Sequence, residues 1–584
     1  MKYSEINNDF KLPIYYTDKK ESIDGNIIID LELNEFNIKN DNKEHPDLSN
    51  NKSKLEINNL KKIDNLYNNI IKPKTLLGKN LLQQWPEYIS YDKDFLLDNQ
   101  KIYSQVKVSN YTDIDGLFTE WYNIKNHPDF LYKYNFLEWE ILKPINKNSF
   151  VMQCLSIYSL ISPIMSLCLP IILCIIPYFI LKATNKNITF ESYYSILKTT
   201  LIRIPIGKLL HLKNMSVGSQ LYTVITSLFY IYQIYQNSVW CYKFYLDQFK
   251  ITNYFEKLKD FSLFTINEID NYLKVSIKCQ SHNIFNNKII QHKLDLQKFI
   301  NDINTIQHFK LNVSSLSNIG YTMVEYYKLY NDIDKKELLC YSFGLNAYFE
   351  HITLIQCKIN NKTINKCKFN KKHTKFVKSF NPILNKEDAV KNTVSIKKNK
   401  LITGPNAAGK TTLLKSILFN IIFSQQIGFG FYKSGNVKLY RYLHCYINIP
   451  DTSGRDSLFQ AEARRCKEIL SLIENNKENN HFCIFDELYS GTNPIEAVAT
   501  SYSYLKYINE FKNVNFTITT HYYDLCKKLK NDVDNNHMEI IKEDDNIKYT
   551  YKIKKGMSEI KGGVNVLKDL NFPIKLIDNI KENI

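Results

Sequence analysis

Paired cysteines are missing from this sequence. Its 12 cysteines are scattered over 584 residues and none stands in a Cys-x-x-Cys pair, so neither a zinc site nor a disulfide framework is indicated. Cys154, Cys168, Cys174 and Cys483 lie in strongly apolar runs. We therefore expect reduced, buried cysteines, as in a reducing compartment.

The first thirty residues lack the apolar core of a secretion signal and carry acids and lysines instead. We therefore expect an intracellular protein. No internal repeat is evident. A chain of 584 residues exceeds what one hydrophobic core usually supports, so about two to four domains are expected.

Acidic residues are in deficit. The chain has 76 Lys and Arg against 59 Asp and Glu, a formal net charge of +17. This excess would suit a polyanionic partner such as nucleic acid or an acidic membrane surface. Heavy use of Asn, Lys, Ile and Tyr could equally reflect an AT-rich genome, so both interpretations stay open.

Composition divides the chain into five segments, and only the last carries recognisable chemistry. Polar residues without periodicity predict a loosely ordered arm first, and aromatic density then predicts a small folded module. The predicted segments are the arm at 1–75, the aromatic-rich module at 76–147, an apolar helical region at 148–242, a helical connector at 243–375 and a nucleotide-binding domain at 376–584.

Two runs in the third segment contain no charge. Residues 148–181 exceed the length of one bilayer crossing, and prolines at 163, 170 and 177 would bend the run or divide it into a hairpin. Residues 215–242 are less apolar because they include glutamines. The alternative is that both runs are buried helices of a large helical domain.

The segment between these runs bears on membrane topology. It holds Lys186, Lys198, Arg203, Lys208 and Lys213 against Glu191, which would place it in the cytosol by the positive-inside tendency. One crossing on each side of such a loop would put the C-terminal domain outside. The topology therefore stays open.

A lysine-rich stretch lies farther along the chain. Eight lysines and no acid occur between Lys358 and Lys378. They could contact phosphates, or they could belong to a solvated surface hairpin.

A glycine-rich loop stands between a short apolar strand, Leu401-Ile402, and a helical run that begins near Leu413. Its glycines let backbone N–H groups close around phosphate, and the helix directs its positive N-terminus at the same anion. Lys410 would contact the β and γ phosphates of ATP, and Thr411 would ligate Mg²⁺. This P-loop pattern assigns nucleotide binding to Gly404, Pro405, Asn406, Ala407, Ala408, Gly409, Lys410, Thr411 and Thr412.

Two further strands end in polar residues. The strand from His481 ends in Asp486 and Glu487, the Walker B arrangement, in which Asp486 holds the Mg²⁺ shell and Glu487 orients or deprotonates the attacking water. The strand 515–520 leads into His521, which could sense the γ phosphate. We therefore predict Glu487, His521 and Lys410 as catalytic residues.

Four motifs, at residues 404–412, 457–462, 486–492 and 520–522, and one C-terminal segment resemble the DNA mismatch repair family MutS. Gly404-Pro405-Asn406 with Gly409-Lys410-Thr411-Thr412 is similar to the family's P-loop, and Thr520-His521-Tyr522 is similar to its Thr-His-Tyr ending. Asp486-Glu487 with Gly491-Thr492 resembles the family's Asp-Glu-x-x-x-Gly-Thr segment. Ser457, Phe459 and Glu462 resemble its Ser-x-Phe-x-x-Glu signature, and Gly556 to Ile577 its C-terminal helical element.

The resemblance implies an ATPase that uses ATP and Mg²⁺. It implies a C-terminal α/β P-loop NTPase domain of the ABC type, with a mixed, largely parallel sheet, behind a lever-like helical domain. The candidate transmembrane helices are predicted from the two uncharged runs, which stand where the repair proteins would have soluble domains. Ser457 would reach the γ phosphate held by a second subunit, so a homodimer, or a heterodimer with a related subunit, is expected. A helix N-cap is the alternative role for Ser457.

The resemblance is firm only over residues 376–584. Ala389 stands where the repair proteins commonly place an aromatic residue against adenine, so base stacking would come from elsewhere. Phe118-Thr119-Glu120 and Phe136-Leu137-Glu138 fit the family's Phe-x-Glu wedge without its context. We therefore expect a divergent, truncated member without a recognisable mismatch-recognition domain.

Two classes of function follow. In the first, a dimer clamps double-stranded DNA, mismatched or branched, and ATP hydrolysis drives the clamp in mismatch repair. In the second, a membrane-associated ATPase, with its catalytic domain facing the cytoplasm, acts on a membrane or protein partner without recognising mismatches. Net charge favours the first class, and the uncharged runs favour the second.

Overall fold

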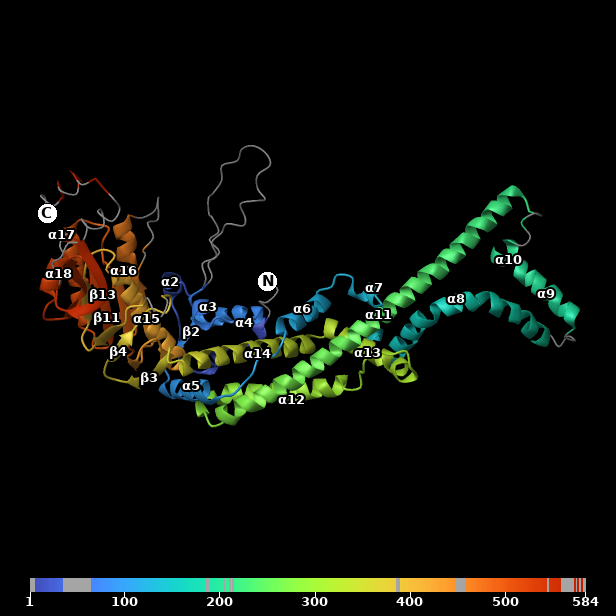
Figure 1. Cartoon of the computed structure of the whole chain (residues 1–584), viewed down its shortest axis with the longest axis horizontal. Coiled ribbons are helices and arrows are strands. Elements are labelled where there is room, and N and C mark those ends of the chain that lie inside the picture. Colours follow the sequence, from blue (N-terminus) through green and yellow to red (C-terminus); the bar gives the residue numbers. More distant parts are fainter. Residues whose placement is uncertain are drawn as a thin grey trace. The chain divides into compact units, whose positions relative to one another are not determined.

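The computed structural model describes residues 6–34, 65–183, 189–203, 205–209, 212, 215–384, 389–447, 449, 457–543, 546–557, 572–573, 575–576 and 579–580 (Figure 1). The chain forms two compact units. The first unit comprises Met1–Thr112, Asn267–His292 and Cys340–Ile584, and the second comprises Asp113–Ile266 and Lys293–Leu339. Each unit thus combines segments distant in sequence, which differs from the five consecutive segments expected.

A six-stranded sheet forms the centre of the first unit. Its strand order is β13-β12-β6-β11-β10-β9. Neighbours run parallel from β12 to β9, and only β13 is antiparallel, so the mixed, largely parallel sheet is confirmed. The strands are β6 (Lys400–Thr403), β9 (Tyr442–Tyr446), β10 (His481–Asp486), β11 (Val514–Thr520), β12 (Asp534–Glu543) and β13 (Asn546–Lys555).

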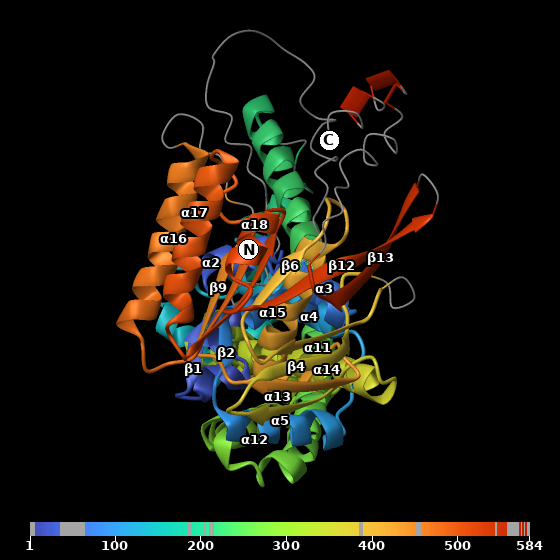
Figure 2. The same cartoon turned by 90° about the vertical axis from the view of Figure 1, so that its left-hand side faces the viewer.

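Helices cover this sheet on both sides. The apolar face of α16 (Leu458–Asn475) packs Cys466, Ile469 and Ile473 into the core that also contains Phe485. Figure 2 shows α17 (Pro494–Asn509) beside α16, and Tyr504 of α17 donates a hydrogen bond to the Cys466 carbonyl. Because both faces are buried, β10 is a continuous apolar run rather than an alternating one.

A second sheet of five strands has the order β5-β4-β8-β3-β7. Its strand β8 pairs with both β3 and β4. Strand β8 therefore lies between the two strands of the lysine-rich stretch. The surface hairpin, one of the two interpretations of this stretch, is wrong. The strands are β3 (Asn365–Asn370), β4 (Thr374–Ser379), β5 (Asn392–Ile396), β7 (Phe429–Gly430) and β8 (Ser434–Lys438).

The N-terminal residues contribute to the first unit. Phe10 is fully buried and packs edge-on against Phe285 and Tyr341, so residues 6–34 form packed elements rather than a loose arm. Residues 35–64 lie outside the described ranges. The N-terminal elements are α1 (Ile6–Asp9), η1 (Pro13–Tyr16), β1 (Lys20–Ser22), α2 (Gly25–Asp30), α3 (Leu66–Ile71), α4 (Leu76–Leu81), η3 (Leu82–Glu87), β2 (Tyr88–Ser90) and α5 (Lys93–Gln105). The first unit also contains the short helices η6 (Gln280–His282) and α18 (Tyr523–Lys528).

Helix α15 (Lys410–Ile427) joins this N-terminal region to the sheet. Two buried glutamines near its C-terminal end bind backbone groups far away in sequence. The Gln426 amide donates to the carbonyls of Trp85 (2.6 Å) and Tyr88 (3.1 Å). The Gln425 amide donates to the Ser90 carbonyl (3.1 Å). The hydrogen bonds satisfy polar groups that would be costly to bury alone.

The second unit is helical in its described residues. It contains α6 (Ile114–Lys125), α7 (Phe130–Lys133), η4 (Lys143–Lys147), α8 (Ser149–Ala183), α9 (Phe190–Arg203), α10 (Pro205–Leu209) and α13 (Val313–Asn331). Residues of both units occur in α11 (Val217–Ser276), α12 (Asn283–Ile303) and α14 (Ile333–Asn360).

The aromatic residues of 76–147 do not form one module. Trp85 and Phe95 are buried in the first unit, whereas Trp121 and Phe130 are buried in the second. Phe130 stacks on Tyr330 at 4.0 Å between ring centroids. The aromatic residues therefore belong to two different cores, and the boundary between the two units along this segment follows Thr112.

Helix α8 runs through its three prolines without a break, so the proposed division into a hairpin is wrong for this run. Over Ser149–Cys168 it is long and apolar enough to cross a membrane, and only 17% of its most apolar stretch is buried. Within the described residues this stretch is therefore mostly exposed rather than buried. Cys154 on this helix is exposed, contrary to expectation, while Cys483 is buried in β10.

Candidate nucleotide site

The glycine-rich loop connects β6 to α15 at the carboxyl end of the parallel strands. Gly404 and Gly409 have φ of +155° and +87°, backbone conformations that other residues rarely adopt. Ala407 shares this left-handed region with φ of +63°. The loop therefore turns tightly, and α15 begins directly after it with the N-terminus that the sequence predicts to face phosphate.

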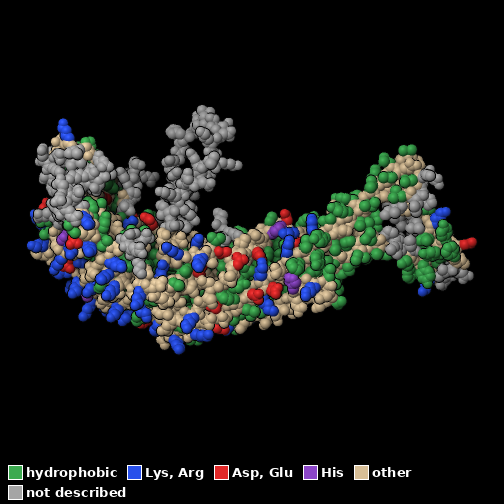
Figure 3. Space-filling model, viewed as in Figure 1, with side chains coloured by type: hydrophobic (Ala, Val, Ile, Leu, Met, Phe, Trp, Pro, Cys, Tyr) green, Lys and Arg blue, Asp and Glu red, His purple; other side chains and the backbone are tan. Residues whose placement is uncertain are grey.

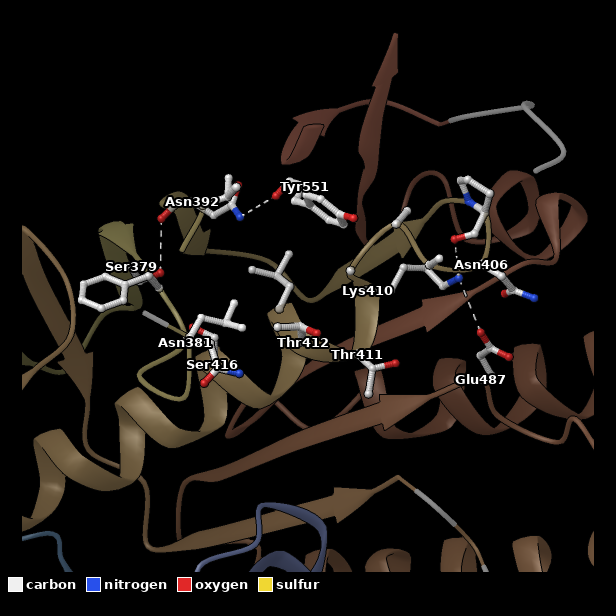
Figure 4. A pocket seen from close by; sticks show the side chains of 18 residues that line it. Ser379, Asn381, Asn392, Asn406, Lys410, Thr411, Thr412, Ser416, Glu487 and Tyr551 are labelled. Carbon is white, nitrogen blue, oxygen red and sulfur yellow. Dashed lines mark hydrogen bonds and ion pairs between the residues drawn. The ribbon is translucent and has the colours of Figure 1, made fainter. Parts of the chain in front are cut away.

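Lys410 lies over this loop. Its ammonium group donates to the carbonyls of Gly404 (3.0 Å) and Pro405 (3.1 Å), and it lies 3.5 Å from a carboxylate oxygen of Glu487 (Figure 4). Burial lowers the pKa of Lys410 below its usual value, an effect that the charges of Glu487 and Asp486 oppose. An added phosphate would favour the charged lysine further.

Thr411 and Asp486 present oxygens to the same point. The Thr411 hydroxyl donates to Asp486 Oδ2 at 2.6 Å, and the Thr519 hydroxyl of β11 donates to Asp486 Oδ1. A hydroxyl and a carboxylate are hard oxygen donors, and Mg²⁺ at phosphate sites commonly takes few protein ligands of this kind. The pair therefore fits the predicted Mg²⁺ site.

Glu487 and His521 form the other side of the site. His521 Nε2 lies 2.5 Å from Glu487 Oε1, and Glu487 holds a left-handed backbone with φ of +53°. The hydrogen bond from His521 lowers the pKa of Glu487, with a further contribution from Lys410 and against the effect of burial. Such strain in a non-glycine residue is typical of functional positions.

A cavity of about 550 Å³ adjoins these residues. The loop residues Pro405 to Thr412 line it together with Glu487, so the predicted phosphate-binding residues share one pocket. Two aromatic residues that sequence reasoning did not assign, Phe380 and Tyr551, also line it. The Tyr551 ring lies against Gly409, where an added Cβ would approach it to 3.0 Å.

Asn392 joins the two sheets beside this cavity (Figure 4). Its amide donates to the Tyr551 carbonyl and its oxygen accepts from the Ile553 N–H, both at 2.9 Å. Tyr551 has φ of +56°, which places a bend in β13 at this contact. The sequence offered only a similarity of Asn392 to a family strand, and no local pattern could indicate its distant partner.

Ser457 caps α16 and is not among the residues that line the cavity. It forms a reciprocal capping box with Gln460, so the expected N-cap role is present. Buried Glu462 accepts hydrogen bonds from the Ser490 and Gly491 N–H groups, which ties this helix to the loop after Glu487. Residues 558–571 of the expected C-terminal element lie outside the described ranges.

Comparison with known proteins agrees with these features. Residues 400–584 match the family MutS domain V. The chain is 29% identical over 199 residues to the DNA mismatch repair protein MutS of Persephonella marina, which covers 33% of this chain and 22% of that protein. It is 27% identical over 223 residues to Endonuclease MutS2 of Staphylococcus saprophyticus, and this alignment covers 38% of the chain and 28% of that relative.

The matched region thus spans about a quarter of each relative's length. It contains the glycine-rich loop and Glu487, which line the cavity, and Asp486 and His521, which contact Thr411 and Glu487 there. Residues 400–584 are thus a domain V of the MutS type.

Proposed function

We propose that the protein hydrolyses ATP with Mg²⁺ at the cavity beside α15. The observation that carries this proposal is the convergence of Lys410, Thr411, Asp486, Glu487 and His521 from one loop and two neighbouring strands. Lysine at the loop, oxygen ligands for Mg²⁺ and a carboxylate beyond them are the parts that phosphoryl transfer needs.

The chain's own residues divide the reaction between them. Lys410 binds the β and γ phosphates, and Thr411 with Asp486 would hold Mg²⁺, which neutralises phosphate charge when bound. Glu487 accepts a hydrogen bond from water and takes its proton as the water oxygen attacks the γ phosphorus. The bond from that phosphorus to the bridging oxygen breaks, and the electron pair leaves with ADP.

Nucleotide binding would rearrange this site. Lys410 and His521 both contact the Glu487 carboxylate, and a γ phosphate would compete for these two donors. Glu487 would then be free to turn toward water. His521 reports the γ phosphate by this exchange of partners.

The active species is a dimer in this proposal, either a homodimer or a heterodimer with a related subunit. Ser457 stands at the exposed N-terminus of α16, where a γ phosphate of a second subunit could be bound in trans. Both relatives named above are MutS-type proteins, and the proposal of a dimer that clamps DNA follows from the match to domain V.

Double-stranded DNA is the proposed partner, and a lysine-covered face of the second sheet favours it. Lys368 of β3 and Lys375 of β4 both pair with Asn436 of β8. Directly paired residues point to the same face of a sheet, and both lysines are exposed. Figure 3 shows lysine and arginine side chains gathered over this region at the lower left.

Salt dependence of DNA binding tests this partner. Lys368→Ala/Lys375→Ala should reduce the slope of log affinity against log salt by about 1 to 2, because each lost phosphate contact releases about one counterion fewer. Lys467→Ala/Lys512→Ala, at exposed lysines elsewhere in the first unit, is the control. Equal slopes for both pairs would argue against this face, and homoduplex, mismatched and branched DNA would show any preference for structure.

A second candidate function is a membrane-associated ATPase, intracellular with its catalytic domain in the cytoplasm. The exposed, uncharged stretch of α8 favours it. Lys410→Ala separates hydrolysis from both partners, because it should abolish ATP turnover without changing either surface. Turnover that survives this substitution would contradict the proposed active site.

A further inference from the structure

The helices α8 and α11 place polar groups between them in the second unit. The Tyr230 hydroxyl of α11 donates to the Ser166 carbonyl at 2.6 Å, and the Asn237 amide donates to the Ser166 hydroxyl at 2.7 Å. Cys241 donates to the Leu160 carbonyl at 3.3 Å. Three hydrogen bonds thus connect the two helices.

The outward faces of the same two helices are apolar. Ile161, Ile164 and Leu167 of α8 are exposed, and so are Leu228, Phe229 and Ile231 of α11, with Ile164 59% and Leu228 61% exposed. Figure 3 shows the hydrophobic side chains along this part of the surface. Helices that pair in water have the opposite arrangement, with an apolar stripe between them and polar residues outside.

The apolar surface extends around each helix. At about 100° per residue, positions 157, 158, 161, 164, 165 and 167 of α8 cover roughly half of its circumference, and positions 221, 222, 225, 228, 229 and 231 of α11 do the same. A stripe that receives one partner helix is narrower, about 100° wide. Lipid chains around both helices fit this wide apolar surface better than a single folded partner does.

The length and the charges of the runs agree with a lipid environment. Residues 217–242, the part of the second run that lies in α11, contain no charge and, at about 1.5 Å per residue, are about 39 Å long, against roughly 30 Å for the hydrocarbon of a bilayer. Lys147 and Lys182 flank the run on α8, and Lys213 and Lys243 flank that on α11. Long lysine side chains near helix ends reach the headgroups, whereas Lys147 is paired with Asp332 at 3.0 Å.

We propose that α8 and the first half of α11 form a pair of helices embedded in the hydrocarbon of a lipid bilayer. Hydrogen bonds hold the pair together, since the hydrophobic effect does not drive helices together in lipid. This inference rests on the membrane-associated candidate function and is independent of ATP hydrolysis.

Flotation with phosphatidylcholine vesicles tests the proposal. The full chain, reconstituted from mild detergent, should float with the vesicles on a density gradient and stay bound in 1 M NaCl, because neutral lipid offers the lysines no net anionic charge. Ile164→Lys/Leu228→Lys should lower the floating fraction about tenfold or more. Both sites are exposed, so the substitutions leave the packing of the unit in place.

Two controls keep the outcomes distinct. Val313→Lys makes the same change at a residue of the second unit that is 84% exposed and lies on α13, and this variant should float like the unsubstituted chain. Lys410→Ala should lose hydrolysis and still float. The proposal would be overturned if the chain stayed at the bottom of the gradient as a soluble oligomer without detergent, with a second copy covering the helices. It would also be overturned if the double variant floated as well as the unsubstituted chain.

Discussion

At the residue scale, the proposed attack of water depends on the contact between Glu487 and His521. Each side chain could be predicted from its place at the end of an apolar strand, because parallel strands end at the same sheet edge. Their direct contact at 2.5 Å could not. It depends on the left-handed backbone at Glu487, for which the residue type gives no signal.

We expect Glu487→Gln to slow ATP hydrolysis by about 10²- to 10⁴-fold, the usual contribution of a general base. Nucleotide binding should remain, because glutamine keeps the size of the side chain while Lys410 and the loop are unchanged. Single-turnover hydrolysis and binding of a labelled nucleotide measure the two effects. A parallel loss of both would assign Glu487 to binding instead.

His521→Ala should change stability with pH. The pKa of Glu487 lies below its ordinary value of 4.5, chiefly through the His521 hydrogen bond. The ionised group therefore stabilises the fold above about pH 4.5, and this contribution is lost as pH falls through the lower folded pKa. We expect His521→Ala to cost about 0.5 to 1 kcal/mol near pH 5, given the partial exposure of the pair, and less in stronger acid.

Thermal melting between pH 3 and 7 measures this effect. The matched control is His521→Ala in a Glu487→Gln background, where the carboxylate is absent and the difference should no longer depend on pH. If the pH dependence persists in that background, another group is responsible.

At the element scale, the contact between β5 and β13 depends on one side chain. Asn392 is buried, and Asn392→Ala removes its two hydrogen bonds to partly buried backbone groups of β13, so we expect a loss of about 1 to 3 kcal/mol in the free energy of unfolding. ATP affinity should fall as well, because Tyr551 lines the cavity from the strand that Asn392 holds.

The control for this prediction is Asn381→Ala. Asn381 also lines the cavity, but its side chain makes an exposed bond to the nearby Ile383 N–H, so the cost should stay within about 0.5 kcal/mol. Urea unfolding and nucleotide titration of both variants decide the matter. Equal losses would show that Asn392 has no special role between the sheets.

Elements differed in how far the sequence predicted them. The strand that ends in Asp486 and the helix after the glycine-rich loop could be predicted, because each combines an apolar run with a short sequence motif beside it. The place of β8 between β3 and β4 was not, because pairing between distant strands leaves no local pattern. The packed residues 6–34 were missed for a similar reason, as their apolar partners are distant in sequence.

At the scale of the whole molecule, Ser457 tests whether two chains complete one site. Ser457→Ala should cut turnover while ATP binding persists, but it also removes the N-cap of α16, which costs about 1 kcal/mol. Ser457→Asp separates these effects. Aspartate caps a helix as serine does, yet its charge would repel a γ phosphate from the partner, so turnover should fall at unchanged stability.

Sedimentation with ATP in the Glu487→Gln background would follow the dimer directly. We expect Ser457→Asp to weaken nucleotide-dependent dimerisation by about tenfold or more. Turnover equal to that of the unsubstituted protein would exclude a role in trans. Lys467→Ala on the same helix, at an exposed position, should leave dimerisation unaffected.

Helix α15 limits how the chain can be divided. One end carries Lys410, and the other is bound through Gln425 and Gln426 to residues 85–90. A fragment of residues 376–584 would keep the proposed catalytic side chains, but the buried Gln426 amide would lose its partners at Trp85 and Tyr88, and Gln425 would keep only its bonds to Tyr440. The family model matches residues 400–584. The compact unit that contains them also includes residues 85–90, whose carbonyls bind the end of α15.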